Sequence, residues 1–250
     1  MFKDIIRGFF NITEDVADHN EIRDRILSGG KVTGTNMCVM VCAVIIASVG
    51  LNTDSVAVII GAMLISPLMG SILAIAYGTE SANARLAEKH ILGLLFQINI
   101  SVGAATIYFA LSPVKSETEQ ILARTSPTLF DVLIAIAGGI AGIIGQTRKD
   151  KANNIVPGVA IATALMPPLC TCGYAIANGK IKMLLEAAYL FIINAYFIFL
   201  SAALILSVLE VPKVKELTDE QWLRLRRRMI RNSIIIIIPS VFALYSIHMK

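Results

Sequence analysis

The residues best placed to do chemistry in this sequence stand beside prolines in the middle of two apolar segments. They are Ser66-Pro67 in the first segment and Pro167-Pro168 in the second. Proline has no backbone N–H and its ring clashes with the preceding turn, so each segment is expected to form a broken helix. A broken helix frees backbone carbonyls and amides, which can bind an ion or a small polar solute. The chemistry that these residues suggest is therefore binding.

The two apolar segments, 52–78 and 153–179, also resemble each other. They align without a gap and share the central proline, Pro67 or Pro168, and a closing Ala-Ile-Ala-x-Gly. Similar interrupted segments in the two halves of a membrane protein are typical of a transporter's binding site. The alternative is a chance similarity between two kinked helices of one bundle, because small apolar sequences align easily.

The candidate binding residues are those at the breaks and the polar residues within or at the ends of apolar segments. They are Ser66, Pro67, Thr163, Pro167, Pro168, Thr171, Asn99, Asn194 and Asp54. Asn99 and Asn194 lie in corresponding segments of the two halves and are expected to face the bundle interior, either in the site or as hydrogen-bonding contacts between helices. Asp54 is the acid nearest a broken helix, and its alternative role is that of a helix N-cap.

A soft metal such as Cu(I) could be held by thiol and thioether groups near the breaks, namely Cys170, Cys172, Met166 and Met63. These residue types are also common packing residues, and no histidine accompanies them. We therefore expect no metal and no cofactor. Because no paired acids and no nucleophile with a base stand at the centre of an apolar segment, we expect no catalytic residues and no enzyme activity.

The composition predicts a multi-pass membrane protein, since 56% of residues are hydrophobic, 16% are charged and the mean hydropathy is +0.71. A helix needs roughly 20 apolar residues to cross a bilayer. Seven candidate spans are expected, near 36–51, 56–78, 90–111, 129–146, 155–178, 183–209 and 232–248. The predicted fold is all-α, with two three-helix repeats, each with a proline-broken middle helix, and a further C-terminal helix.

This interpretation divides the chain into six regions. They are a cytoplasmic amphipathic segment (1–35), membrane repeat 1 (36–111), an external loop (112–128), membrane repeat 2 (129–209), a basic cytoplasmic interfacial helix (210–231) and a C-terminal transmembrane helix (232–250). Lysine and arginine are biased most strongly to the N-terminal side if both broken segments cross the membrane. The N-terminus is then cytoplasmic and the repeats are inverted. Re-entrant hairpins are the alternative, and they would make the repeats parallel.

Two further groups of residues are expected to contact lipid or other helices. Trp222, Arg226, Arg227 and Arg228 form a basic, amphipathic stretch that predicts contact with anionic lipid headgroups and not with nucleic acid. The small residues Gly138, Gly142 and Gly145 would share one face of a helix. Such a face allows close packing against another helix of the chain or against a second copy in a homo-oligomer.

The stretch VIIGAMLISPLMGSILAIAYG (58–78), together with ALMPPL (164–169), resembles a family of uncharacterised prokaryotic membrane proteins that share a hydrophobic domain of unknown function. The resemblance covers roughly residues 35–210. It implies a multi-pass protein of a bacterial or archaeal inner membrane, and it implies no particular substrate.

The expected function is that of a secondary transporter or permease for a small solute or ion bound between the two proline-broken helices. One alternative is an oligomeric ion channel with the glycine-rich helix at the contact between protomers. The other is a membrane scaffold that does not transport.

Overall fold

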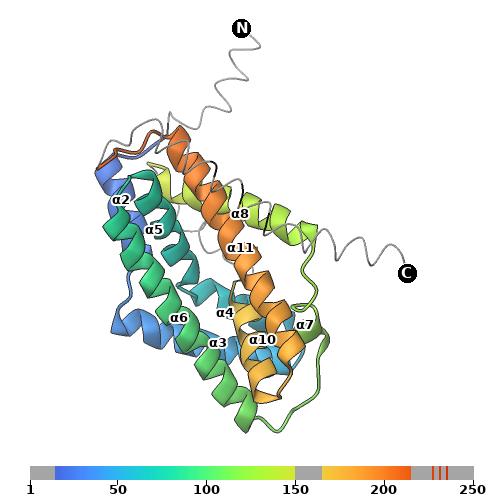
Figure 1. Cartoon of the computed structure of the whole chain (residues 1–250). Coiled ribbons are helices and arrows are strands. Elements are labelled where there is room, and N and C mark those ends of the chain that lie inside the picture. Colours follow the sequence, from blue (N-terminus) through green and yellow to red (C-terminus); the bar gives the residue numbers. More distant parts are fainter. Residues whose placement is uncertain (1–14, 150–164, 215–226, 228–230, 232–234, 236–250) are drawn as a thin grey trace.

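The computed structural model of the chain describes residues 15–149, 165–214, 227, 231 and 235. Apart from one isolated β-bridge between Val16 and Arg148, the regular structure of these residues is entirely helical (Figure 1). The helices are α2 (His19–Gly29), α3 (Gly34–Asn52), α4 (Val56–Ile65), α5 (Leu68–Glu80), α6 (Ala84–Leu111), α7 (Glu119–Leu122), α8 (Leu129–Thr147), α10 (Met166–Ala177) and α11 (Ile181–Val208).

Four of these helices, α3, α6, α8 and α11, are long and apolar enough to cross a membrane. The pair α4 and α5, which is bent by 45° at its junction, is a fifth such segment. The chain is therefore an all-helical integral membrane protein, as its composition predicts. Of the other two predicted spans, 155–178 is described only where it forms α10, and 232–248 lies almost wholly outside the described residues.

The two longest helices, α6 and α11, run in opposite directions (Figure 1). After the end of α11, the Val214 N–H donates to the carbonyl of Ser81, just before α6 begins. At the other end Lys180, which precedes α11, pairs with Glu117, which follows α6. We name the first end the α2 end, because α2 lies there, and the second the α7 end.

The remaining spans are also oppositely directed in the two halves of the chain. Asn52, the last residue of α3, donates a 2.7 Å hydrogen bond to the Ser112 hydroxyl at the α7 end. Thr147, the last residue of α8, accepts a 2.8 Å bond from the N–H of Ala17 at the α2 end. Between the end of α3 and the start of α6, the chain therefore passes through α4 and α5 from the α7 end to the α2 end. Between the end of α8 and the start of α11, it passes from the α2 end to the α7 end.

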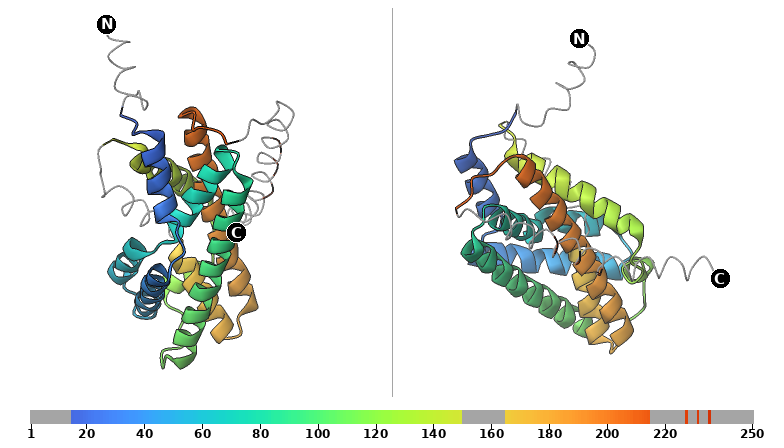
Figure 2. Two further views of the ribbon diagram at one scale, coloured as in Figure 1. Left: turned by 90° about the vertical axis from the view of Figure 1, so that its left-hand side faces the viewer. Right: turned by 45° about the horizontal axis from the view of Figure 1, so that its top comes forward.

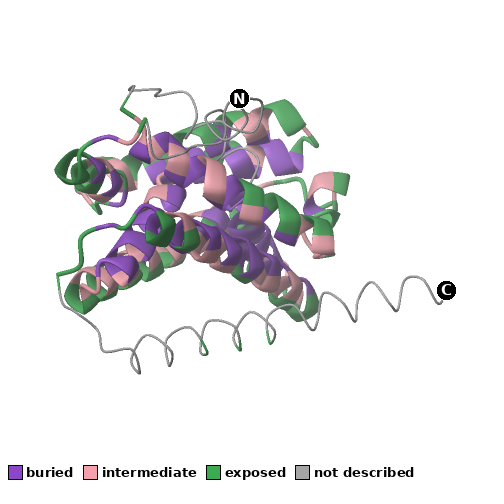
Figure 3. Cartoon of the chain, turned by 90° about the horizontal axis from the view of Figure 1, so that it is seen from above, coloured by how far each residue is buried: buried purple, intermediate pink, exposed green. Residues whose placement is uncertain are grey.

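Helices of the two halves pack against each other at the centre. α10 lies against α6, and α5 lies against α11. The approach of α10 is close because of Gly173, where an added Cβ would lie 2.5 Å from the Cβ of Ala105. Figure 3 shows buried positions gathered between the helices, with exposed positions on the outer faces. Exposed apolar residues such as Leu92, Phe96 and Leu133 are what a lipid-facing surface requires.

Two further contacts complete the fold. α8 lies along α11 (Figure 2, right), with Gly139 so close that an added Cβ would lie 2.0 Å from the Ser201 hydroxyl.

α2 buries Ile22 and packs along α5. Its Arg25 donates a 2.5 Å hydrogen bond to the carbonyl of Arg148, just after α8. The expected amphipathic N-terminal helix therefore joins α5 of the first half to the end of α8.

Candidate functional site

The first predicted broken helix is interrupted at Pro67, as expected from the sequence. α4 ends at Ile65, Ser66 has extended backbone, and Pro67 precedes the first turn of α5. The N–H of Leu68 donates to the Ser66 hydroxyl at 3.5 Å, where a continuous helix would direct it to the carbonyl of Leu64. Because of the break, the N–H of Leu68 does not bond to α4, and the carbonyl oxygen of Leu64 loses this helical donor.

The second predicted break lies at the start of α10. Pro167 and Pro168 occupy its first turn, where the missing N–H groups break no helical hydrogen bond. Both prolines are buried, as is Met166 at the start of the helix. Thr163 lies outside the described residues, so the structure describes only the C-terminal side of this break.

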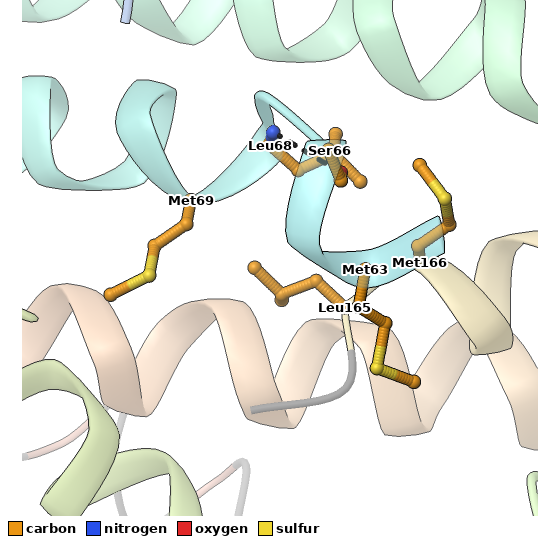
Figure 4. Close-up of a pocket in the computed structure, with 6 residues that line it drawn as sticks. All are labelled: Met63, Ser66, Leu68, Met69, Leu165 and Met166. Atoms are coloured by element: carbon orange, nitrogen blue, oxygen red, sulfur yellow. Dashed lines mark hydrogen bonds between the residues drawn. The ribbon is translucent and has the colours of Figure 1, made fainter. Parts of the chain in front are cut away.

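The two breaks meet at one small pocket (Figure 4). It encloses about 210 Å³, including its open side. It is lined by Met63, Ser66, Leu68 and Met69 from the first break and by Leu165 and Met166 from the second. Ser66 supplies the one polar side chain of this lining, and no lining residue is titratable. Residues beside Pro67 and residues beside Pro167 therefore line one pocket in the part of the chain that the structure describes.

The pocket offers few donors for an anion. A helix N-terminus binds anions through its free N–H groups. Here Pro67, Pro167 and Pro168 have none and the N–H of Leu68 already donates to Ser66, which leaves the N–H groups of Met69 and Gly70 in the first turn of α5. The pocket is therefore apolar, with a serine hydroxyl and backbone carbonyls as its polar groups.

Four of the predicted site residues, Asn99, Asn194, Asp54 and Thr171, do not line the pocket. Asn99 is exposed, and its amide donates to Leu95 O of its own helix at 2.8 Å, so the expectation that it faces the bundle interior was wrong. Asn194 is buried on α11 but does not line the pocket. Asp54 is exposed at the α7 end with a left-handed φ of 54°. It accepts from the Gln120 N–H of α7, while Ser55 is the residue that precedes α4, so Asp54 does not cap the broken helix.

Thr171 is fully buried on α10, and its hydroxyl has no hydrogen-bond partner among the described residues. It does not line the pocket.

Gln97, a polar residue in the middle of an apolar segment, is buried in a polar cluster with Ser71 and Ser101, which the sequence interpretation did not name. Ser71 on α5 donates a 2.9 Å hydrogen bond to Gln97 on α6, and Ser101 lies one turn further along α6. All three side chains are fully buried. Gln97 and Asn99 are both amides in the same span, but they are two residues apart and point to opposite sides of a helix. Only the packing of α5 and α10 on α6 reveals which of the two faces inward.

The thiol and thioether groups do not form a metal site. Cys170 donates to Val44 O on α3 and Cys172 to Leu184 O on α11, so the two thiols point to different helices. Figure 4 shows the side chains of Met63, Met69 and Met166 pointing apart. Within the described residues, no group of three or more His, Cys, Asp or Glu side chains could hold a metal ion.

The glycine face of α8 is used within the chain. Gly138, Gly142 and Gly145 are buried, and α8 packs against α11. Of the predicted lipid-contacting residues, Arg227 is exposed, while Trp222, Arg226 and Arg228 lie outside the described residues.

Comparison with known proteins agrees with the resemblance seen in the sequence. Residues 63–200, which contain all six residues that line the pocket, match the family described as a domain of unknown function (DUF389). An uncharacterized protein of Methanocaldococcus jannaschii is 30% identical over 198 residues, which is 79% of this chain and 57% of that relative. The chain thus spans little more than half the length of this relative. No solved structure matches it significantly. The match over more than half of its length places the chain in the DUF389 family.

Proposed function

We propose that this protein transports a small solute or ion, which binds where the two helix breaks meet. The pocket between Ser66 and Met166 is the observation that carries the proposal. Broken helices are tolerated in a membrane protein where protein or a water-filled cavity satisfies the freed backbone groups. A pocket formed by breaks from both halves of the chain is the arrangement that transporters of several folds use.

The directions of the helices support an inverted repeat. In this proposal α3 corresponds to α8, the pair α4–α5 corresponds to the segment that ends in α10, and α6 corresponds to α11. Each element runs opposite to its counterpart. α5 packs on α11 of the other half, and α10 packs on α6 in the same exchanged way. Exchanging the conformations of two such halves would open the pocket first to one side and then to the other.

The charges of the described residues support one orientation. The basic residues at or near the α2 end are Arg23, Arg25, Lys31, Arg85, Lys89, Arg148, Lys149 and Lys213, and those at the α7 end are Lys115, Arg124, Lys180 and Lys182. Because loops rich in lysine and arginine stay in the cytoplasm, we assign the α2 end to the cytoplasmic side of a prokaryotic inner membrane.

One argument for the alternative function, an oligomeric ion channel, is weakened by the structure. It relied on the glycine-rich helix to join protomers, but that helix packs on α11 of its own chain through Gly139. Transport through the pocket between the breaks therefore explains more of the described structure.

Alternating accessibility at Ser66 tests the proposal without knowledge of the substrate. Ser66→Cys is made in a background in which the four native cysteines are replaced, and an impermeant maleimide is applied to right-side-out and inside-out vesicles. Ala84→Cys at the α2 end and Lys115→Cys at the α7 end report the sidedness of each preparation. We expect Ser66→Cys to be labelled from both sides, with each control labelled from one. Labelling of Ser66→Cys from one side only would contradict alternating access.

A further inference from the structure

The buried polar cluster is incompletely hydrogen-bonded. We call Ser71, Gln97 and Ser101 the polar triad. The one hydrogen bond within it runs from Ser71 Oγ to Gln97 Oε1. Gln97 Nε2 and Ser101 Oγ have no partner among the described residues, although both side chains are fully buried. Buried polar groups are nearly always paired in proteins, so such groups point to an occupant that supplies the missing bonds.

The polar triad lies beside the pocket between the breaks. On α5, Ser71 is one helical turn beyond Leu68, which lines the pocket, and therefore shares its face. On α6, Gln97 and Ser101 precede Ala105 by two turns and one turn, and Ala105 contacts Gly173 of α10. α6 and α10 both run towards the α7 end. Met166 is two turns before Gly173 on α10, and Gln97 is two turns before Ala105 on α6, so Met166 and Gln97 lie at about the same depth in the bundle. The triad therefore lies where α5 meets α6, one turn beyond Leu68 and at the level of Met166, although none of its three residues lines the pocket.

The chemistry of the polar triad favours an uncharged ligand. It contains an amide and two hydroxyls, with no charged side chain that would balance the charge of an ion. Ca²⁺ and Mg²⁺ take about six or more oxygen ligands. The triad has three side-chain oxygens, and one already accepts a hydrogen bond from Ser71. If the amide of Gln97 were turned over, it would present one acceptor in place of its N–H, which is still too few.

We propose that the polar triad is a binding site for a neutral, hydrogen-bonding molecule, either water or a small uncharged solute. Gln97 Nε2 donates to an oxygen of the ligand, and the Ser101 hydroxyl donates to it or accepts from it. Ser71 holds the Gln97 amide in place. This inference rests on the proposed transport function, since it names the class of molecule that the pocket would pass.

The test uses purified full-length protein in liposomes and stopped-flow light scattering. Gradients of sucrose, urea and glycerol measure the flow of water and of the two uncharged solutes, and separate assays measure the flow of K⁺ and Cl⁻. We expect at least one uncharged probe to cross faster than in protein-free liposomes. Flow of water alone would identify water as the occupant, and flow of urea or glycerol would identify a solute.

Variants connect that flow to the polar triad. Gln97→Met removes the amide but keeps the length of the side chain, and Ser101→Ala removes one hydroxyl. Each should lower the flow about tenfold, the effect of losing one hydrogen bond of ordinary strength. Asn99→Ala is the matched control, because this exposed amide lies on the same helix two residues away, and it should leave the flow unchanged. Thermal unfolding in detergent should show Ser101→Ala to be at least as stable as the wild type, since its hydroxyl has no partner among the described residues, and Gln97→Met to unfold at a lower temperature, since the buried Ser71 hydroxyl loses its acceptor.

The inference is overturned if no uncharged probe crosses faster than in protein-free liposomes, or if Gln97→Met and Ser101→Ala behave like the wild type. Flow of K⁺ or Cl⁻ without uncharged flow, in a protein whose Ser66→Cys is labelled from both sides, would overturn the neutral ligand and leave the transport proposal standing. Labelling of Ser66→Cys from one side only would instead overturn the transport proposal.

Discussion

Gly70 lies in direct backbone contact with Gly29: a Cβ added at Gly70 would be 2.1 Å from the Gly29 carbonyl oxygen. Gly70 belongs to the first turn of α5 and is adjacent to Met69 of the pocket, while Gly29 is the last residue of α2. The end of α2 is thus pressed against the helix that forms one side of the break. Through Arg25 the same helix also reaches the end of α8. A change at the pocket therefore has a short physical path to the α2 end.

Gly70→Ala should separate α2 from α5. The added methyl meets backbone atoms, which cannot rotate away, so we expect a loss of roughly 1–3 kcal/mol in the free energy of unfolding. Gly61→Ala on α4 is the matched control, because no atom lies within 4 Å of its added Cβ. Thermal unfolding in detergent, followed by circular dichroism, measures both. Equal stability of the two variants would contradict the described contact between α2 and α5.

Gly139→Ala should destabilise the contact between α8 and α11. Its Cβ would lie 2.0 Å from Ser201 Oγ and 2.6 Å from the Ile198 carbonyl oxygen. Because the second obstacle is backbone, adding Ser201→Ala should recover only part of the loss, which we expect to be about 1–3 kcal/mol. Gly103→Ala on α6, with open space around it, serves as the control. Full recovery in the double variant would show that the backbones of α8 and α11 lie further apart.

Pro67→Ala should impair transport without unfolding the protein. Alanine restores an N–H and favours helix by about 3 kcal/mol over proline, so α4 and α5 would straighten towards one continuous helix. We expect a melting temperature equal to or above that of the wild type, together with loss of labelling of Ser66→Cys from one side. Pro113→Ala, which changes a proline in the segment that follows α6, is the control. A Pro67→Ala protein with normal two-sided labelling would show that the break is not needed for access.

At the α7 end, the buried hydroxyl of Tyr174 should contribute more to the free energy of unfolding than the ion pair between Lys180 and Glu117. Tyr174 is fully buried and donates a 2.7 Å hydrogen bond to Lys115 O, so Tyr174→Phe should cost about 1 kcal/mol. Lys180 and Glu117 form an ion pair in which both side chains are about a third exposed, and Glu117 raises the pKa of Lys180 by hydrogen bonding to it. Glu117→Gln should cost less than about 1 kcal/mol, because solvent screens such pairs. Chemical unfolding of the two variants ranks the effects, and a larger loss in Glu117→Gln would reverse the expected order.

The local features of this protein follow from short stretches of sequence. The apolar runs predicted the helices, and Pro67 predicted where one of them breaks, because a missing N–H and a ring clash act within one helical turn. The glycines of α8 predicted a helix face for close packing, and in the structure the close approach of α8 to α11 is at Gly139. Neighbouring residues are enough for such predictions, since backbone hydrogen bonding in a helix is local.

Features that depend on facing helices could not be predicted in the same way. Asn99 and Gln97 are equivalent by composition and depth, yet one is exposed and the other is fully buried. Asp54 stands next to α4 in the sequence but bonds to α7, because the left-handed turn at the α7 end directs its side chain there.

The sequence by itself determined that this is a membrane protein of apolar helices, broken at Ser66-Pro67, because these properties arise from residue hydrophobicity and local backbone chemistry. Only the tertiary structure decided that this break meets the start of α10 and that Gln97 is the amide buried beside the pocket. Those outcomes depend on which helix faces packed together across the two halves of the chain, and no local pattern specifies that choice.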